Sequence, residues 1–258
     1  MSSARGEGRG TGDRSHYSYA HYANADVAAG FDALRFGGPI GQLLADTQER
    51  VIAAFLGNLS GLHIVDVGTG TGRAAIALAS RGASVTAVDA SVEMLDVART
   101  RAQAAGADVT FDVGDAHALP FADRSFDAAV SLRVLMHTPG WAQAVGELCR
   151  VSRRRVVFDY PSARSLAALQ AGARRMKAVL GMNTEAYRVF RPGRIRAALD
   201  AHGFRIVGVH RQFVLPIAIH KAVGSRRYTE TSERELAALG LNAAFGSPIT
   251  VVAERCAS

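Results

Sequence analysis

The part of the sequence that most constrains the fold is residues 64–79, which read IVDVGTGTGRAAIALA. Apolar residues that favour a strand lead into three glycines at alternate positions, and the alanine-rich end favours a helix. A buried strand followed by a glycine turn and a helix brings the backbone close to a ligand and directs free N–H groups toward it. The segment therefore predicts a ligand-binding strand–turn–helix unit, with a purely structural loop as the alternative.

The glycine spacing narrows the choice of ligand. The dinucleotide fingerprint is G-x-G-x-x-G/A, and counted from Gly68 its last position falls on Arg73. This departure disfavours an NAD-dependent oxidoreductase. The pattern Asp-x-Gly-x-Gly-x-Gly from Asp66 to Gly72, with Gly70 at its centre, resembles motif I of the class I S-adenosylmethionine (SAM)-dependent methyltransferases. In that family the glycines make room for the methionine part of SAM.

A second acidic residue and a later sequence block extend the resemblance. Asp89 ends a predicted strand a little over twenty residues after Asp66, where a carboxylate can accept both ribose hydroxyls, although this spacing also suits an NAD site. Residues 114–127 read GDAHALPFADRSFD and resemble the family block "GDA-x-x-LPF-x-D-x-SFD". The resemblance implies that Asp115 accepts a hydrogen bond from the adenine amine and that the Ala116 backbone reaches the ring edge.

The similarity covers residues 64 to about 160 and is strongest to small-molecule methyltransferases of type 11, which include the ubiquinone and menaquinone C-methyltransferases. Residues 147–151, ELCRV, match the usual "E-x-x-R-V/L" helix, whereas residues 152–155, SRRR, replace the usual "K-P-G-G" turn. The resemblance implies further cofactor contacts from Thr69, Ala90, Met94 and Leu132.

Strands and helices alternate along most of the chain. Strands are predicted over 63–67, 84–89, 109–113, 126–131, 155–159, 204–209 and 249–254, and helices over 72–81, 92–105, 141–151 and 194–202. Repeated strand–helix units form a parallel sheet covered on both faces. We therefore expect an α/β, Rossmann-like class I methyltransferase fold with a seven-stranded, mostly parallel sheet.

The expected domain organisation is simple, since 258 residues suit one domain with a tail. Residues 1–15 are rich in Gly, Ser and Arg, and we expect them to be a disordered tail. Residues 16–258 are predicted to form a single methyltransferase domain with an N-terminal helical lid over 16–58. Two substrate-side insertions are expected at 162–203, with a long amphipathic helix over 166–180, and at 210–247.

Composition limits the partners. The net charge of +7 can indicate nucleic-acid binding, but the basic residues are spread out, with one tight run at 153–155, so a solvated basic surface is the favoured interpretation. Cys149 and Cys256 are far apart, which disfavours disulfides and a metal site and favours a reducing cytosol. The apolar stretch 213–219 contains Pro216 and is too short to span a bilayer. We expect a cytoplasmic protein without membrane insertion; the sequence carries no signal for its oligomeric state.

An aromatic cluster at residues 16–22 precedes the first predicted helix. In related enzymes a mobile N-terminal segment that carries tyrosine closes over SAM, so Tyr17, Tyr22 and Arg35 are candidates for lid and carboxylate contacts. The alternative is that these aromatic residues only pack on the edge of the sheet.

Two residues after the fourth predicted strand are the candidates for catalysis. His137 is expected at the carboxyl edge of the sheet, where it is either a general base or a structural hydrogen-bonding histidine. Arg133 could bind an acidic substrate or the carboxylate of SAM, or form a surface salt bridge.

The sequence thus predicts a SAM-dependent methyltransferase that acts on a small, partly apolar metabolite, with O-methylation favoured over C-methylation and N-methylation behind both. The alternatives are an RNA methyltransferase, suggested by the charge but lacking an (N/D)PPY motif, a non-catalytic SAM-binding module, and the disfavoured NAD-dependent oxidoreductase.

Overall fold

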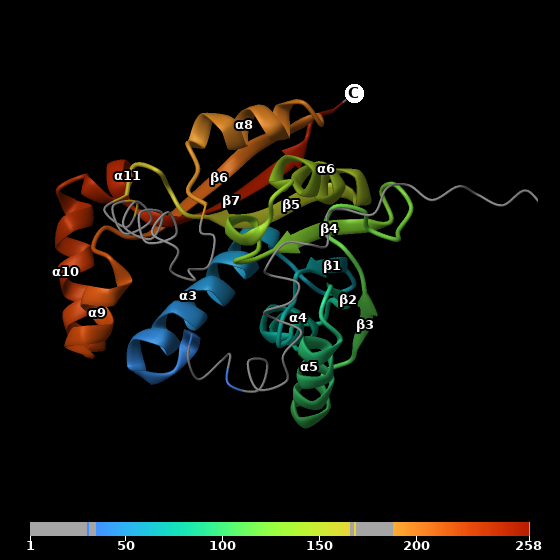
Figure 1. Ribbon diagram of the computed structural model, residues 1–258, viewed down its shortest axis with the longest axis horizontal. Helices are drawn as coiled ribbons and strands as arrows, with labels where there is room; N and C mark the ends of the chain where they lie inside the picture. The colour runs from blue at the N-terminus through green and yellow to red at the C-terminus, as the bar shows by residue number, and fades with distance from the viewer. Residues whose placement is uncertain (1–29, 31–34, 166–167, 169–187, 258) are drawn as a thin grey trace, which may run out of the picture.

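A computed structural model describes residues 30, 35–165, 168 and 188–257. It contains a seven-stranded sheet with the strand order β3-β2-β1-β4-β5-β7-β6 (Figure 1). The first five strands are parallel, and β7 is antiparallel to both of its neighbours. The strands are β1 (His63–Val67), β2 (Ser84–Asp89), β3 (Val109–Val113), β4 (Phe126–Ser131), β5 (Ser152–Tyr160), β6 (Phe204–Phe213) and β7 (Ser247–Arg255). The predicted α/β, Rossmann-like, mostly parallel fold is confirmed.

The centre of the sheet is also the point where strand order reverses. β1 pairs with β2 on one side and with β4 on the other, so the chain leaves β1 and β4 toward opposite sides. Ile64 and Val65 in β1 are completely buried, as an apolar strand covered on both faces requires. A crevice at the carboxyl ends of these strands is where ligands bind in open α/β sheets.

Helices cover both faces of the sheet (Figure 1). On one face lie α6 (Trp141–Val151) and α8 (Pro192–Asp200), whose apolar side chains join a core cluster with β4, β5 and β7. On the other face lie α3 (Gly38–Leu56), α4 (Arg73–Ala79) and α5 (Val92–Ala105). Residues of α3 and α4 form the second core cluster there.

The arginine-rich segment before Val156 is part of a strand and not a turn. α6 ends at Val151 and β5 begins at Ser152, three residues earlier than predicted. The register between β4 and β5 shifts between Phe126 and Ala128, which accommodates the extra residue of β5. The charge of Arg155 is compensated, because its guanidinium lies 2.7 Å from Glu254 and donates to the Leu56 carbonyl. The predicted strand was too short since these partners are distant in sequence.

The segment between β6 and β7 is helical, with α9 (Ile217–Val223), α10 (Arg226–Ala238) and α11 (Leu241–Phe245). Both α9 and α10 contact α3. Inside this segment His220 is fully buried, with Nε2 2.9 Å from Glu233 and Nδ1 3.1 Å from Thr229 Oγ1. The segment follows the carboxyl end of β6, the end that β6 shares with β5, and its role as a substrate-side insertion stays a prediction.

Several predictions lie outside the described residues. These are the tail over 1–15, the first part of the lid with Tyr17 and Tyr22, and most of the helix expected over 166–180. The helix α3 occupies the second half of the range predicted for the lid. No helix in the described part of the chain has the length and apolar character needed to cross a membrane.

Candidate active site

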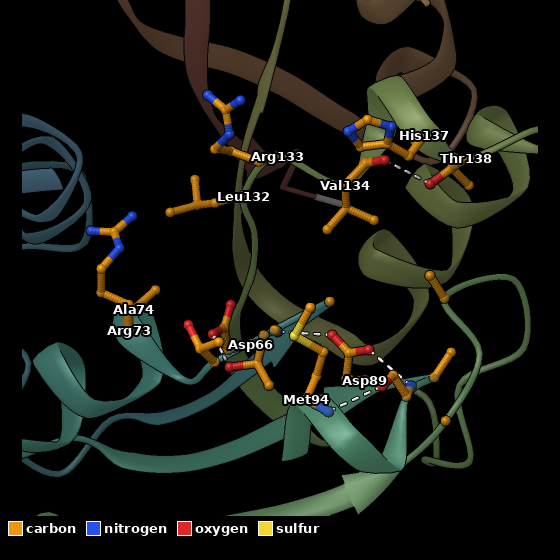
Figure 2. A pocket seen from close by; sticks show the side chains of 18 of the residues that line it. Asp66, Arg73, Ala74, Asp89, Met94, Leu132, Arg133, Val134, His137 and Thr138 are labelled. Carbon is orange, nitrogen blue, oxygen red and sulfur yellow. Dashed lines mark hydrogen bonds between the residues drawn. The ribbon is translucent and has the colours of Figure 1, made fainter. Parts of the chain in front are cut away.

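A cavity opens at the carboxyl ends of β1, β2 and β4, at the reversal of strand order (Figure 2). Its walls come from the glycine turn, the end of β2, the loop after β3 and the loop after β4. Eleven of the predicted site residues line it: Asp66, Gly68, Thr69, Gly70, Asp89, Ala90, Met94, Ala116, Leu132, Arg133 and His137. The fold thus brings together residues of the glycine turn, Asp89, the 114–127 block and the segment after the fourth predicted strand.

The glycine turn needs glycine for two different reasons. Gly68, Gly70 and Gly72 all have positive φ angles, of 72°, 55° and 79°. At Gly68 a Cβ would lie 2.2 Å from Val134 Cγ2, so the turn and the loop after β4 are in close contact. At Gly70 a Cβ would meet nothing within 4 Å. Gly70 thus leaves its backbone open to the cavity, while Gly72 caps the start of α4 and does not line the cavity.

Asp66 fixes the shape of the turn from below. Thr69 Oγ1 donates to Asp66 Oδ2 at 2.7 Å, and the carboxyl group is almost completely buried. Burial raises the pKa of Asp66 to about 6, against the opposing effect of the Thr69 hydrogen bond. Asp66 therefore acts mainly on the conformation of the turn.

Asp89 is held by both of its carboxylate oxygens. Its Oδ2 accepts the Gly70 N–H at 2.8 Å and its Oδ1 accepts the Ser91 N–H at 3.0 Å. Burial raises its pKa, while these backbone bonds oppose the rise. Each oxygen has a second lone pair, so the fixed carboxylate can still accept hydrogen bonds from a pair of neighbouring hydroxyl groups.

At the far end of the cavity Asp115 is engaged with a neighbour. Its Oδ1 accepts the His117 N–H at 2.8 Å and lies 2.7 Å from His117 Nδ1. Ala116 and His117 line the cavity, whereas Asp115 does not. Gly140 leaves room for the imidazole, because a Cβ there would lie 2.8 Å from His117 Cδ2. His117 was missed from the sequence, although its place inside the GDAHALPF block was a usable signal.

The "E-x-x-R" motif holds this loop in place. Glu147 accepts the Leu119 N–H at 2.8 Å, and Arg150 donates to the Leu119 and Phe121 carbonyls. Glu147 and Arg150 also pair with each other at 2.7 Å. Burial raises the pKa of Glu147, but the hydrogen bonds from Arg150 and Leu119 outweigh it and lower the pKa overall. The motif on α6 thus positions the loop that carries Ala116.

The wall after β4 carries both predicted catalytic residues (Figure 2). His137 ends the short 3-10 helix Leu135–His137, is 9% exposed and lines the cavity. Arg133 lines the same cavity with a positive φ of 60°, and its backbone N–H donates to Asp159 Oδ1. Asp159 is fully buried at the end of β5 and does not line the cavity.

Arg73, which excluded the dinucleotide pattern, also lines the cavity. It donates to Gln48 Oε1 at 2.6 Å, lies 3.5 Å from Glu49, and stacks over the Phe36 ring at 4.1 Å. The neighbouring Arg35 does not line the cavity, and its carbonyl accepts a hydrogen bond from Lys221. The predicted contact Tyr22 is outside the described residues.

Neither cysteine contributes to the cavity. Cys149 is buried in the core, where burial raises its pKa to about 12, and Cys256 is exposed near the end of the chain. Across residues 35–165 and 188–257 there is no group of three or more His, Cys, Asp or Glu side chains that could hold a metal ion.

Comparison with known proteins agrees with this geometry. Residues 64–155 match a family model described as a methyltransferase domain. The chain is 41% identical over 104 residues to demethylmenaquinone methyltransferase of Thermus thermophilus, a match that covers 38% of this chain and 47% of that protein. The chain spans between 39% and 47% of the length of the curated relatives it matches.

Solved structures share the fold over most of the chain. Magnesium protoporphyrin IX methyltransferase from Synechocystis PCC 6803 with bound SAM is 21% identical and has a TM-score of 0.62. The match covers 96% of this chain and 100% of that chain. The [4+2]-cyclase SpnF is 22% identical with a TM-score of 0.59, over 83% of this chain and 81% of that one. Residues 64–155 are therefore similar to a methyltransferase domain, and the described chain has the Rossmann-like fold of class I methyltransferases.

Proposed function

We propose that this protein transfers a methyl group from SAM to a small, partly apolar metabolite. The observation that carries the proposal is the fixed carboxylate of Asp89 beside the open backbone of Gly70, inside the segment that matches a methyltransferase domain. A hydroxyl-binding carboxylate next to a glycine turn suits the ribose and the amino-acid chain of SAM.

The residues present fit that cofactor along the whole cavity. Asp89 would accept the ribose hydroxyls, and the backbone near Ala116, with Met94 and Ala90 beside it, would contact the adenine. The turn from Gly68 to Gly70, fixed by Asp66 and Thr69, would contact the methionine part. The Synechocystis methyltransferase was crystallised with bound SAM, and its similar fold supports the same use of the cavity here.

SAM supplies an electrophilic methyl group on a sulfonium, so the protein needs to bind and orient an acceptor and keep water out. Leu132 and Val134 give the wall after β4 an apolar surface suited to a partly apolar acceptor. His137 on the same wall would take the proton of a hydroxyl group or an acidic carbon at one of its ring nitrogens.

Small-molecule substrates are supported by two of the similar proteins, a demethylmenaquinone methyltransferase and a magnesium protoporphyrin IX methyltransferase. Among acceptors we favour oxygen over carbon, because a general base at His137 matters most for a hydroxyl group. Nitrogen acceptors, which need no base when neutral, come third.

Titration with S-adenosylhomocysteine tests the cofactor. We expect binding below millimolar concentration, and lack of heat or of thermal stabilisation at that concentration would contradict the proposal. An assay with methyl-labelled SAM and metabolite extracts then tests for transfer. Binding of the cofactor without any transfer would favour a second candidate, a SAM-binding protein with another role. The similar fold of SpnF, a [4+2]-cyclase, occurs in a protein named for a different reaction.

The role of His137 needs a separate measurement. If it is the base, His137→Ala should lower kcat about 10²–10⁴-fold and leave the affinity for S-adenosylhomocysteine within about 2-fold. The pH profile of the residual activity should lose its neutral limb. If turnover barely changes while the variant is less stable, the histidine is structural.

A further inference from the structure

The backbone of Arg133 adopts a conformation that side chains other than glycine rarely take. Among the described residues only Arg124 and Arg133 combine a side chain with positive φ, at 54° and 60°. Arg124 lies on an exposed turn, whereas Arg133 lies in the cavity wall. A left-handed conformation at a non-glycine residue persists only where the surroundings enforce it, and such residues cluster at functional sites.

A chain of buried hydrogen bonds enforces it here. The Arg133 N–H donates to Asp159 Oδ1, and Gln48 Nε2 donates to Asp159 Oδ2 at 3.4 Å. Gln48 in turn accepts from Arg73 at 2.6 Å. Asp159 is fully buried and Gln48 is 4% exposed, so solvent does not compete for these bonds. The loop after β4, the end of β5, α3 and α4 are thereby joined behind one wall of the cavity.

Arg73 and Arg133, at the two ends of this hydrogen-bond network, line the same cavity. Burial has the largest effect on the pKa of Arg73 and lowers it, while the charge of Glu49 raises it. The positive charge of Arg133 lowers the pKa of Arg73 further, because the two cations are near each other. Figure 2 shows both side chains on the same side of the cavity, with Leu132 between them.

The two arginines differ in the hydrogen bonds and salt bridges that their guanidinium groups make. The Arg73 guanidinium is bound by Gln48 and Glu49. The Arg133 guanidinium makes no hydrogen bond or salt bridge within the described residues, and it is only partly exposed. A half-buried guanidinium with open donors is suited to a bidentate contact with a carboxylate or phosphate.

We infer that Arg133, with Arg73 behind it, binds an acidic group of the methyl acceptor, so that the substrate is an organic acid with an apolar body. This inference rests on the proposed function, because it assigns the acceptor side of the same cavity. Leu132 and Val134 flank Arg133 and would contact the apolar body. Asp159 is a positioning residue, which fixes the backbone that presents the guanidinium.

The test uses the full-length protein saturated with S-adenosylhomocysteine, whose affinity is measured first by calorimetry. Matched probes are then titrated by ligand-observed NMR: benzoate, benzamide and phenyl phosphate, followed by a panel of small acids with their primary amides. Four proteins are compared: wild type, Arg133→Gln, Arg133→Lys and Arg154→Gln. Arg154 is exposed near the start of β5, so its variant removes the same charge at the opposite end of the sheet.

We expect the acids to bind the wild type at least about 10-fold more tightly than their amides. Arg133→Gln should remove this preference, Arg133→Lys should keep part of it, and Arg154→Gln should keep all of it. The relative affinities of benzoate and phenyl phosphate identify the preferred anion. Glutamine has the same backbone requirement as arginine, so the variant should fold.

Three results would overturn the inference. Equal binding of acids and amides, or no bound acid at all, would show that the arginine does not select an acid. A preference that survives Arg133→Gln would assign it elsewhere. A 10-fold or greater loss of S-adenosylhomocysteine affinity in Arg133→Gln, without a change in acid preference, would assign Arg133 to the cofactor. If the wild type fails to bind S-adenosylhomocysteine, the proposed function itself fails.

Discussion

Replacing Gly68 by alanine should destabilise the protein for two additive reasons. Its φ of 72° is unfavourable for alanine, at about 1–2 kcal/mol. The new Cβ would lie 2.2 Å from Val134 Cγ2 and 3.3 Å from two other Val134 carbons, where carbon atoms prefer roughly 3.5–4.0 Å. Relieving such an overlap typically costs about 1–3 kcal/mol. We therefore expect the free energy of unfolding to fall by about 2–5 kcal/mol.

Gly70→Ala is the matched control, because it measures the cost of a positive φ angle for alanine without a steric clash. Its φ is also positive, at 55°, but a Cβ there meets no atom within 4 Å. We expect a loss of about 1–2 kcal/mol in stability. Because Gly70 lines the cavity, its methyl group should instead reduce the affinity for S-adenosylhomocysteine.

Urea denaturation followed by circular dichroism measures both variants on one scale. The double variant Gly68→Ala/Val134→Ala completes a cycle, in which removal of the valine methyl groups should recover the steric part as a favourable coupling of at least about 1 kcal/mol. Equal destabilisation at Gly68 and Gly70, or a coupling near zero, would refute the close contact between the turn and the loop after β4.

Three further predictions concern the carboxylates. Asp89→Asn should weaken S-adenosylhomocysteine binding about 10–100-fold by calorimetry, because an amide NH₂ would face a backbone N–H; the exposed Asp108→Asn should change nothing. Folding raises the pKa of Asp66 from 3.8 to about 6, so ionisation of this carboxyl group destabilises the folded state. The free energy of unfolding should therefore fall by about 3 kcal/mol between pH 4 and 7 and stay level above pH 7. In denaturation experiments at each pH, Asp66→Asn should remove this dependence. Glu147→Gln should lower the free energy of unfolding by about 1–3 kcal/mol at pH 7, and this difference should vanish in acid, below the lowered pKa of Glu147. A difference that persists in acid would contradict the stabilising ion pair between Glu147 and Arg150.

The parts of the fold that sequence predicted best depend on local pattern. The bounds of β1, β2, β3 and β4 agree with the prediction, because each is a short segment with apolar residues in a local strand pattern. The start of β5 was wrong, because consecutive arginines look like a solvated turn. Only the tertiary partners of Arg155, which come from α3 and β7, make a strand there favourable.

The site shows the same division between local and distant information. The Asp89 contact with Gly70 follows from two motifs that adjacent parallel strands bring together, so it could be anticipated. Arg73 was used only to exclude a dinucleotide site, since its partners Gln48 and Phe36 lie 25 or more residues upstream with no motif around them. The positive φ of Arg133 has no sequence signal, because the buried Asp159 that enforces it belongs to another strand.

The buried carboxylates on the cavity floor also bear on how the spent cofactor departs. Burial raises the pKa of both Asp66 and Asp89, so each anion lacks solvation that a nearby cation can replace. SAM brings a sulfonium charge and S-adenosylhomocysteine does not. Methyl transfer would therefore remove the electrostatic attraction between the sulfonium of SAM and these two carboxylates. Inhibition by the product, relative to SAM affinity, should weaken as pH rises past about 6 and Asp66 ionises.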